Sequence, residues 1–473
     1  MIGLIALGRV SILASAIVYP QVSSARESLR YDAIHSGTPW FDQRGLPVSA
    51  HGGGIIKVED TYYLFGEAHR DMTNAFAGFN CYSSKDLVNW RFERVALPVQ
   101  RSGALGPETV GERPKVMRSP VTGEYVMLMH ADTIDYRGQF VGYATAKAVT
   151  GPYTFQGPLL FGGKPIKKWD MGAFQDHDGA GYLLLHGGDI YRLSDDFRSV
   201  QEHVHKAMEH GFESPTLFRD GDVYYFIGSN LTGWERNDNY YFTATSLKGP
   251  WTRQGLIAPQ GTLTWNSQVT FVVPVKGSAR KTYMFMGDRW SYPRQASAAT
   301  YVWQPLIIEG DRLAMPAYRD AWRVDIAQGT IGSKPLINQI ITDDDQQVRY
   351  TGSWRQITAG HSTHHVTDEG NASVSVTFTG KQASLLSLAS PDGGYARIVV
   401  RDRKGNRLLS SIVDMYSKYP MPTVKFVTPL LPTGTYTITA SAVGDGWYWL
   451  NKKGERSGSA GHAISFDGLL IRR

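Results

Sequence analysis

The chain has 473 residues, about three times the length of a typical single domain, so one small core is excluded and two domains or a large repeat array is expected. Hydrophobic residues make up 42% of the chain and charged residues only 19%, which excludes a disordered protein. The 50 glycines and the 12% aromatic residues favour a β protein over a helical bundle. The net charge of +6 is small for this length and no dense basic cluster appears, so nucleic acid is not an expected partner.

The N-terminus resembles a secretory signal peptide. Arg9 precedes the apolar stretch 11–19, and the small residues 23–25 offer a cleavage site. We therefore predict that residues 1–25 are a signal peptide and that the protein is exported to the periplasm or the extracellular space. A proline after the apolar stretch leaves a cytoplasmic start as the alternative. Cys81 is the only cysteine, which excludes an intrachain disulfide, and no later apolar run is long enough to span a membrane.

Five segments repeat one pattern, in which a polar start leads into an apolar strand, a turn and a second strand rich in tyrosine. They begin near residues 53, 112, 170, 213 and 266. Each is followed by a further pair of strands, and a spacing of roughly 50 residues is typical of a propeller blade. We therefore predict an all-β fold with a five-bladed β-propeller over residues 26–326. Because the first strand of each blade begins at the central axis, its first residues should meet in one pocket.

The repeat stops after Trp322, and the stretch 327–339, with glycines and a proline, is the predicted linker. Short alternating strands without a helical period predict a jelly-roll-like β-sandwich over residues 340–473. Aromatic rings stack on pyranose rings, so this accessory domain is a candidate for carbohydrate binding. The candidate rings are those of Trp354, Trp447, Tyr448 and Trp449. Packing of these rings against each other or against the propeller is the alternative.

Two carboxylates stand at equivalent positions of the repeats, Glu112 and Glu213. Glycoside hydrolysis needs a carboxylic acid to protonate the leaving oxygen and usually a second group that activates water or attacks the sugar. Phe212 and Pro215 flank Glu213, and such an apolar setting raises the pKa of a carboxyl group, as a general acid requires. The alternative for Glu213 is a salt bridge with Arg113.

Four motifs carry a resemblance to a known family. They are Glu112-Arg113-Pro114-Lys115-Val116, Glu213-Ser214-Pro215-Thr216-Leu217-Phe218, Thr232-Gly233-Trp234 and Asn266-Ser267-Gln268-Val269-Thr270. With five blades, they resemble glycoside hydrolase family 43, and within it the exo-β-1,3-galactanases of subfamily 24, over residues 45–325. Most of that family has an aspartate general base in the first blade, where this chain has Ala50-His51-Gly52-Gly53-Gly54. The galactanase subfamily shares this absence.

The resemblance implies roles for three residues. Glu213 would be the general acid, Glu112 would orient it, tune its pKa and bind the sugar, and Gln268 would position or activate the attacking water. Because an amide is a poor base, the physical case for Gln268 rests on positioning. The resemblance further implies that the galactose subsite is lined by Glu67, Arg113, Tyr136, Asp170, Thr232 and Trp234.

No metal or cofactor is predicted. Four histidines near strand ends lack the spacing of a metal site, and we interpret them as hydrogen-bonded or core residues. They are His51, His69, His130 and His186. The glycines 52–54 are not followed by the lysine and helix of a phosphate-binding loop.

The expected partner is a polysaccharide, the β-1,3-galactan main chain of arabinogalactan, and the expected reaction is exo-acting hydrolysis with inversion. A family 43 enzyme that acts on arabinofuranosyl or galactofuranosyl ends is one alternative. A carbohydrate-binding propeller that has lost catalysis is the other, since the missing aspartate would also explain that outcome.

Overall fold

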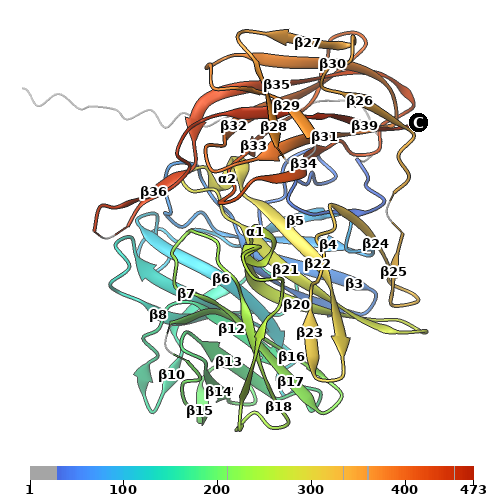
Figure 1. Ribbon diagram of the computed structural model, residues 1–473. Helices are drawn as coiled ribbons and strands as arrows, with labels where there is room; N and C mark the ends of the chain where they lie inside the picture. The colour runs from blue at the N-terminus through green and yellow to red at the C-terminus, as the bar shows by residue number, and fades with distance from the viewer. Residues whose placement is uncertain (1–28, 210, 334, 360–361, 452) are drawn as a thin grey trace, which may run out of the picture.

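The computed structural model describes a protein built almost entirely of β-strands (Figure 1). Among the described residues there are two helices, each of four residues, α1 (Leu263–Asn266) and α2 (Gln295–Ala298). The all-β prediction is thus confirmed, whereas the predicted signal peptide lies outside the described residues. These are 29–209, 211–333, 335–359, 362–451 and 453–473.

Five sheets follow one another along residues 51–314, and their strand pairs are antiparallel except for one edge pair in the third sheet. Four consecutive strands of each sheet lie in sequence order, so strands that are neighbours in the chain pair as hairpins. Sheet by sheet, the strands are β2 (His51–Val58), β3 (Thr61–Glu67), β4 (Phe79–Ser84) and β5 (Arg91–Leu97); β6 (Thr109–Arg118), β7 (Tyr125–Thr133), β8 (Phe140–Ala146) and β9 (Thr154–Pro158); β12 (Met171–Gln175), β13 (Gly181–Leu185), β14 (Asp189–Leu193) and β15 (Val200–His205), with β10 (Leu160–Phe161) and β11 (Lys164–Pro165) at the edge; β16 (Phe212–Asp220), β17 (Val223–Asn230), β18 (Tyr240–Ala244) and β19 (Thr252–Leu256); and β20 (Gln268–Lys276), β21 (Lys281–Arg289), β22 (Thr300–Glu309) and β23 (Arg312–Ala314).

The first strands of the five sheets form a closed circuit of contacts: β2 contacts β6, β6 contacts β12, β12 contacts β16, β16 contacts β20, and β20 contacts β2 again. A hydrophobic cluster fills each space between successive sheets, including the space between the fifth and the first. Because side chains alternate along a strand, Leu184 packs toward the fourth sheet and its neighbour Leu185 toward the second. The sheets are therefore held together by packing on both faces.

Four of the five first strands are irregular where they begin. The register shifts between His51 and Gly54, between Glu112 and Lys115, between Glu213 and Thr216, and between Val269 and Phe271. Arg113 and Ser214 have a φ of 53° at two of these places. A β-bulge bends its strand and redirects side chains. As a result Glu112 and Arg113, which would face opposite sides of a regular strand, line the same cavity.

The C-terminal unit, which we define as β26 to β39, lies above the five sheets in Figure 1, in orange to red. A four-stranded and a five-stranded sheet share one hydrophobic core. The strands are β26 (Gln339–Thr342), β27 (Val348–Thr351), β28 (Arg355–Ala359), β29 (Ser362–Thr367), β30 (Ser373–Gly380), β31 (Gln382–Ala389), β32 (Gly394–Asp402), β33 (Arg407–Asp414), β34 (Met421–Val427), β35 (Gly434–Gly446), β36 (Tyr448–Leu450), β37 (Arg456–Gly458), β38 (Ile464–Phe466) and β39 (Gly468–Arg472).

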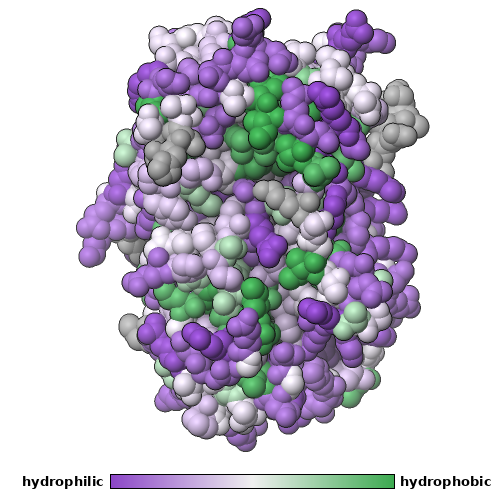
Figure 2. Space-filling view, turned by 45° about the vertical axis from the view of Figure 1, so that its right-hand side comes forward, coloured by the Kyte–Doolittle hydropathy of each residue, from purple (hydrophilic) through white to green (hydrophobic). Residues whose placement is uncertain are grey.

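A small three-stranded sheet lies between the five sheets and the C-terminal unit in the chain order of two of its strands, β24 (Ala321–Asp325) and β25 (Thr330–Gly332). Its third strand, β1 (Ile34–His35), precedes the five sheets and pairs with β24. The predicted linker, residues 327–339, therefore contains a paired strand. The face of the molecule in Figure 2 is mostly hydrophilic, with hydrophobic residues gathered in a few patches. Among the described residues, no helix is long and apolar enough to cross a membrane.

Candidate active site

The beginnings of the first strands surround a cavity of about 330 Å³. Eight of the nine residues predicted for the site line this cavity: Glu67, Glu112, Arg113, Tyr136, Asp170, Glu213, Trp234 and Gln268. The ninth, Thr232, is not among the lining residues. Seven further residues complete the lining: His130, Asp132, Trp169, Leu231, Gly233, Trp290 and Trp449. The repeat pattern thus brings the predicted residues together, as expected.

Arg113 connects the elements around the cavity. Its backbone N–H donates to Glu67 Oε1 at 2.8 Å, and its side chain donates to Asp170 Oδ1 at 2.8 Å, Ser214 Oγ at 2.7 Å and Gln268 Oε1 at 2.9 Å. The residue is buried, and buried charges are stable only when they are paired and hydrogen-bonded. Burial alone would raise the pKa of Asp170, but the Arg113 charge and hydrogen bond hold it below its ordinary value. Asp170 is therefore an anion.

Glu213 has the opposite protonation state. Burial and then the negative charge of Asp170 raise its pKa well above the ordinary value, against the lowering effects of Arg113 and of hydrogen bonds from the Thr232 backbone and Gln268. Glu213 therefore keeps its proton at a pH where an ordinary glutamate has lost it. Two carboxyl groups whose pKa values are driven apart by their surroundings are typical of acid and base sites.

Thr232 takes part in a way that the sequence did not indicate. Its hydroxyl donates to the carbonyl oxygen of Glu235 at 2.7 Å and accepts from Asn237 at 2.7 Å. The Thr232 side chain therefore makes its hydrogen bonds within its own turn. Its backbone N–H instead bonds the carboxyl group of Glu213. The expectation that the Thr232 side chain lines the sugar subsite is thus not met.

The amide of Gln268 is fully hydrogen-bonded. Oε1 accepts from Arg113 at 2.9 Å and from the Trp290 indole at 2.9 Å, and Nε2 donates to Glu213 Oε1 at 3.1 Å and to Ser229 Oγ at 3.0 Å. Because guanidinium and indole groups only donate, this network fixes which end of the amide is the oxygen. A water held by Gln268 must replace one of these partners, so the observed contacts support a positioning role rather than basicity.

Glu112 is held at the other side of the cavity by an ion-pair network. It accepts from Tyr136 Oη at 2.6 Å and contacts His130 Nδ1 at 3.1 Å, while His130 Nε2 contacts Asp132 Oδ2 at 3.1 Å. Burial lowers the pKa of His130, but the hydrogen bonds to the two carboxylates outweigh it and raise the pKa to about 9. His130 is therefore an imidazolium at neutral pH, and its ring bridges the side chains of Glu112 and Asp132.

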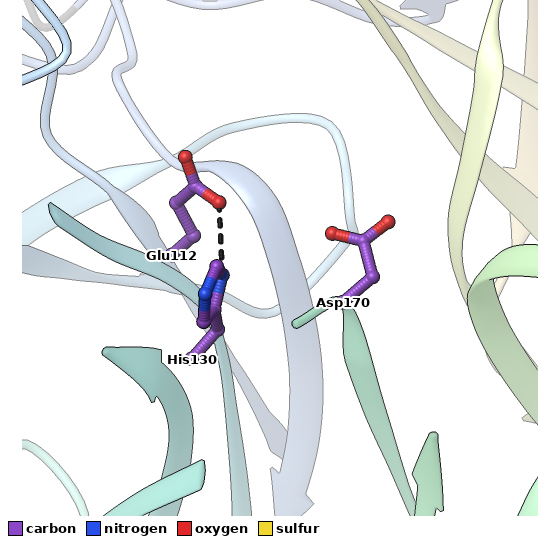
Figure 3. Close-up of side chains that lie close together, drawn as sticks. All are labelled: Glu112, His130 and Asp170. Carbon is purple, nitrogen blue, oxygen red and sulfur yellow. Dashed lines mark hydrogen bonds and ion pairs between the residues drawn. The ribbon is translucent and has the colours of Figure 1, made fainter. Parts of the chain in front are cut away.

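Ligand atoms of Glu112, His130 and Asp170 lie within 4.8 Å of one another, a spacing that a metal ion could use (Figure 3). However, both ring nitrogens of His130 face carboxylates, and a protonated imidazole has no lone pair for a metal. Asp170 is already paired with Arg113. These contacts favour an ion-pair network over a metal centre.

The glycine run at the start of β2 has a steric reason. A Cβ on Gly52, which has a φ of +60°, would lie 1.9 Å from Glu67 Oε1, so any other residue would displace Glu67 from the cavity. The Gly52 N–H donates to Asp288 at 3.0 Å, and Lys115 donates to the Gly52 carbonyl at 2.7 Å. Burial is the main reason why the pKa of Asp288 rises to about 7 and that of Lys115 falls to about 7.

The positions of His130 and Trp290 in the lining follow a rule of hairpin geometry. In an antiparallel hairpin the end of the second strand pairs with the start of the first. Thus Glu112 pairs with His130 and Gln268 with Asp288, two residues before Trp290. The ends of the second strands were the signal that could have found Trp290, and His130 was already noted from the sequence as a hydrogen-bonded or core residue near a strand end.

Comparisons with known proteins identify the family of this chain. Residues 46–261 match the model for "Glycosyl hydrolases family 43". A putative exo-β-1,3-galactanase from Bifidobacterium bifidum is 39% identical, with a TM-score of 0.56, over 59% of this chain and 95% of that chain. The chain belongs to glycoside hydrolase family 43. The predicted family is thus confirmed.

Two further solved structures extend the match of this family 43 hydrolase into the C-terminal unit. An exo-β-1,3-galactanase from Phanerochaete chrysosporium, solved with galactose, is 29% identical, with a TM-score of 0.70, over 93% of this chain and 99% of that chain. An exo-β-1,3-galactanase from Clostridium thermocellum is 25% identical, with a TM-score of 0.60, over 85% of this chain and 100% of that chain. A comparison with curated proteins finds no match.

The coupling of Asp170 to Glu213 predicts a pH effect. Glu213 must be protonated to act as an acid, so kcat/KM falls as the pH rises through its pKa. Asp170→Asn removes a negative charge that raises this pKa, and we expect the alkaline fall of kcat/KM to move to lower pH. The measurement is the pH profile of kcat/KM for glycoside hydrolysis. Asp222→Asn, at an exposed turn, is the control and should leave the profile in place; an unmoved profile for Asp170→Asn would contradict the coupling.

Proposed function

We propose that this hydrolase is an exo-acting, inverting β-1,3-galactanase, which releases galactose or short galacto-oligosaccharides from the β-1,3-galactan main chains of arabinogalactan. One observation carries the proposal: Gln268 donates a hydrogen bond to the buried, protonated Glu213, while the start of β2 supplies glycines and no aspartate. The solved neighbours support the substrate, since a Glu-to-Gln variant of the Phanerochaete chrysosporium enzyme was solved with β-1,3-galactotriose.

The size of the cavity supports exo action. Ligand pockets range from about 300 to 1,000 Å³, and a cavity of about 330 Å³ is at the small end of this range. It suits the terminal sugar of a chain better than an internal stretch of several sugars. Charged groups at its base, including Glu67, Arg113 and Asp170, offer hydrogen-bond partners to the sugar hydroxyl groups.

The chemistry follows from the protonation states. Glu213 donates its proton to the glycosidic oxygen as the bond to the anomeric carbon breaks, and the remaining galactan chain departs as an alcohol. The new carboxylate is stabilised by the charge of Arg113 and by the N–H groups of Thr232 and Gln268. Water attacks the anomeric carbon from the opposite face and the configuration inverts. The proton that this water loses passes to solvent, from which Glu213 is protonated again before the next turnover. Glu112, held in place by Tyr136 and His130, accepts a hydrogen bond from the terminal sugar.

The architecture proposed with this function is a five-bladed propeller over residues 26–326, a linker over 327–339 and a β-sandwich accessory domain over 340–473. The circuit of contacts among the five first strands supports the propeller, and the shared core of the two larger C-terminal sheets supports the sandwich. We also propose that residues 1–25 direct export to the periplasm or the extracellular space, because a polymeric substrate cannot cross a membrane to reach the enzyme.

Replacement of the acid tests the proposal directly. Glu213→Gln has the same shape but cannot donate a proton, so we expect hydrolysis of β-1,3-galactan to fall about 100-fold or more. β-Galactosyl fluoride, whose leaving group needs no proton, should be affected much less. Release of galactose from both substrates is the measurement. Activity on galactan within tenfold of wild type would remove Glu213 from the acid role.

The stereochemical outcome is a second test. Direct attack by water predicts that galactose first appears as the α-anomer, because no covalent intermediate forms on the enzyme. Proton NMR of the product during the first turnovers, before the anomers equilibrate, is the measurement. First appearance of β-galactose would exclude inversion.

The role of Gln268 gives a third test. Gln268→Ala removes the donor to Glu213 and the acceptor for Arg113 and Trp290, so we expect kcat to fall about 100-fold or more, the scale on which misplaced groups are penalised. Gln268→Glu still accepts from Arg113 and Trp290 and should retain part of the rate. Steady-state kinetics on β-1,3-galactan distinguish the variants. Nearly full turnover by Gln268→Ala would show that the water and Glu213 are held by other groups.

A further inference from the structure

One wall of the cavity comes from the C-terminal unit. Trp449, in the middle of β36, lines the cavity, whereas every other lining residue lies between residues 67 and 290. Figure 1 shows β36 in a hairpin that projects from the C-terminal unit beside the five sheets. The candidate active site is therefore built from both units.

The C-terminal unit is anchored to the loop that carries Thr232. Arg236 is almost fully buried, and its guanidinium lies 4.8 Å from the ring centre of Trp447 and 5.3 Å from that of Tyr416. The Tyr416 hydroxyl donates to Glu235 at 3.0 Å, and Arg236 lies 3.8 Å from the carboxylate of Asp414. Such a network is costly to open, because it would leave buried charges unpaired. The position of the hairpin relative to the loop is thus fixed.

Trp449 itself rests on this loop. A Cβ on Gly233 would lie 2.5 Å from Trp449 Cη2, so the indole ring is in direct contact with the Gly233 backbone. Trp234 and Trp449 both pack against the cluster that contains Trp447. Gly233 follows Thr232, whose N–H bonds the carboxyl group of Glu213. The ring therefore lies on the side of the cavity where the general acid is held.

We propose that Trp449 forms the subsite for the sugar that leaves, the first galactose of the remaining chain. The inference rests on the proposed function. The general acid protonates the leaving oxygen, so groups beside the acid contact the leaving sugar. An indole ring offers an apolar face to the ring of a neutral pyranose, and the exposed Leu231, next to Thr232, extends this apolar rim. The C-terminal unit thus favours galactan chains over galactosides with small leaving groups.

The test compares substrates with and without a leaving sugar. For Trp449→Ala in the full chain, we expect kcat/KM to fall about tenfold for β-1,3-galactotriose and to change less than twofold for β-galactosyl fluoride, whose leaving group reaches no sugar subsite. Tyr448→Ala is the matched control, because Tyr448 is the adjacent residue of β36, is 40% exposed and does not line the cavity. It should leave both values unchanged.

Equal losses on both substrates would make Trp449 a purely structural support of the loop and overturn the proposal, as would no loss on either. If the wild-type enzyme releases no galactose from galactan, the proposed function fails instead. The two variants are then compared on the glycan that the wild type cleaves and on the corresponding glycosyl fluoride, and the same contrast decides the role of Trp449. An enzyme that cleaves no glycan would overturn both proposals.

Discussion

The guanidinium of Arg113 is the group around which the site is organised. Arg113 belongs to the second sheet and bonds Glu67 of the first, Asp170 at the start of the third, Ser214 of the fourth and Gln268 of the fifth. The third, fourth and fifth sheets therefore each place a hydrogen-bond partner on one cation, and the first sheet adds the nearby negative charge of Glu67, which bonds the Arg113 backbone N–H. A buried guanidinium needs all of these partners to offset the loss of its hydration, so the relative position of the five strand ends is tied to its charge.

The same cation separates the roles of the carboxyl groups. Its direct ion pair keeps Asp170 ionised, while burial and the charge of Asp170 raise the pKa of Glu213. On the other side, His130 pairs with Glu112 and holds its side chain in place. A protonated Glu213 thus lies beside an ionised Asp170, which is the condition for general acid catalysis near neutral pH.

The C-terminal unit belongs to the site rather than to its surroundings. Of the aromatic residues expected to bind sugar from the sequence, Trp447 is completely buried at the contact with Arg236, and Trp449 reaches the cavity. Packing within the protein therefore accounts for Trp447, whereas contact with a sugar is proposed for Trp449. The loop that contains Thr232 and Gly233 lies between Trp449 and Glu213 and contacts both of these residues.

Local patterns in the sequence determined the all-β class, because repeats and alternation place Glu112, Glu213 and Gln268 at equivalent strand beginnings. The motifs, through their resemblance to family 43, gave the family and the other five predicted residues that line the cavity. Only the tertiary structure decided that the Thr232 hydroxyl bonds within its own turn, that Trp290 enters the site and that Trp449 lines it. These features depend on strand register, on the direction of a turn and on packing between units. Such contacts join residues far apart in the chain, and no local pattern records them.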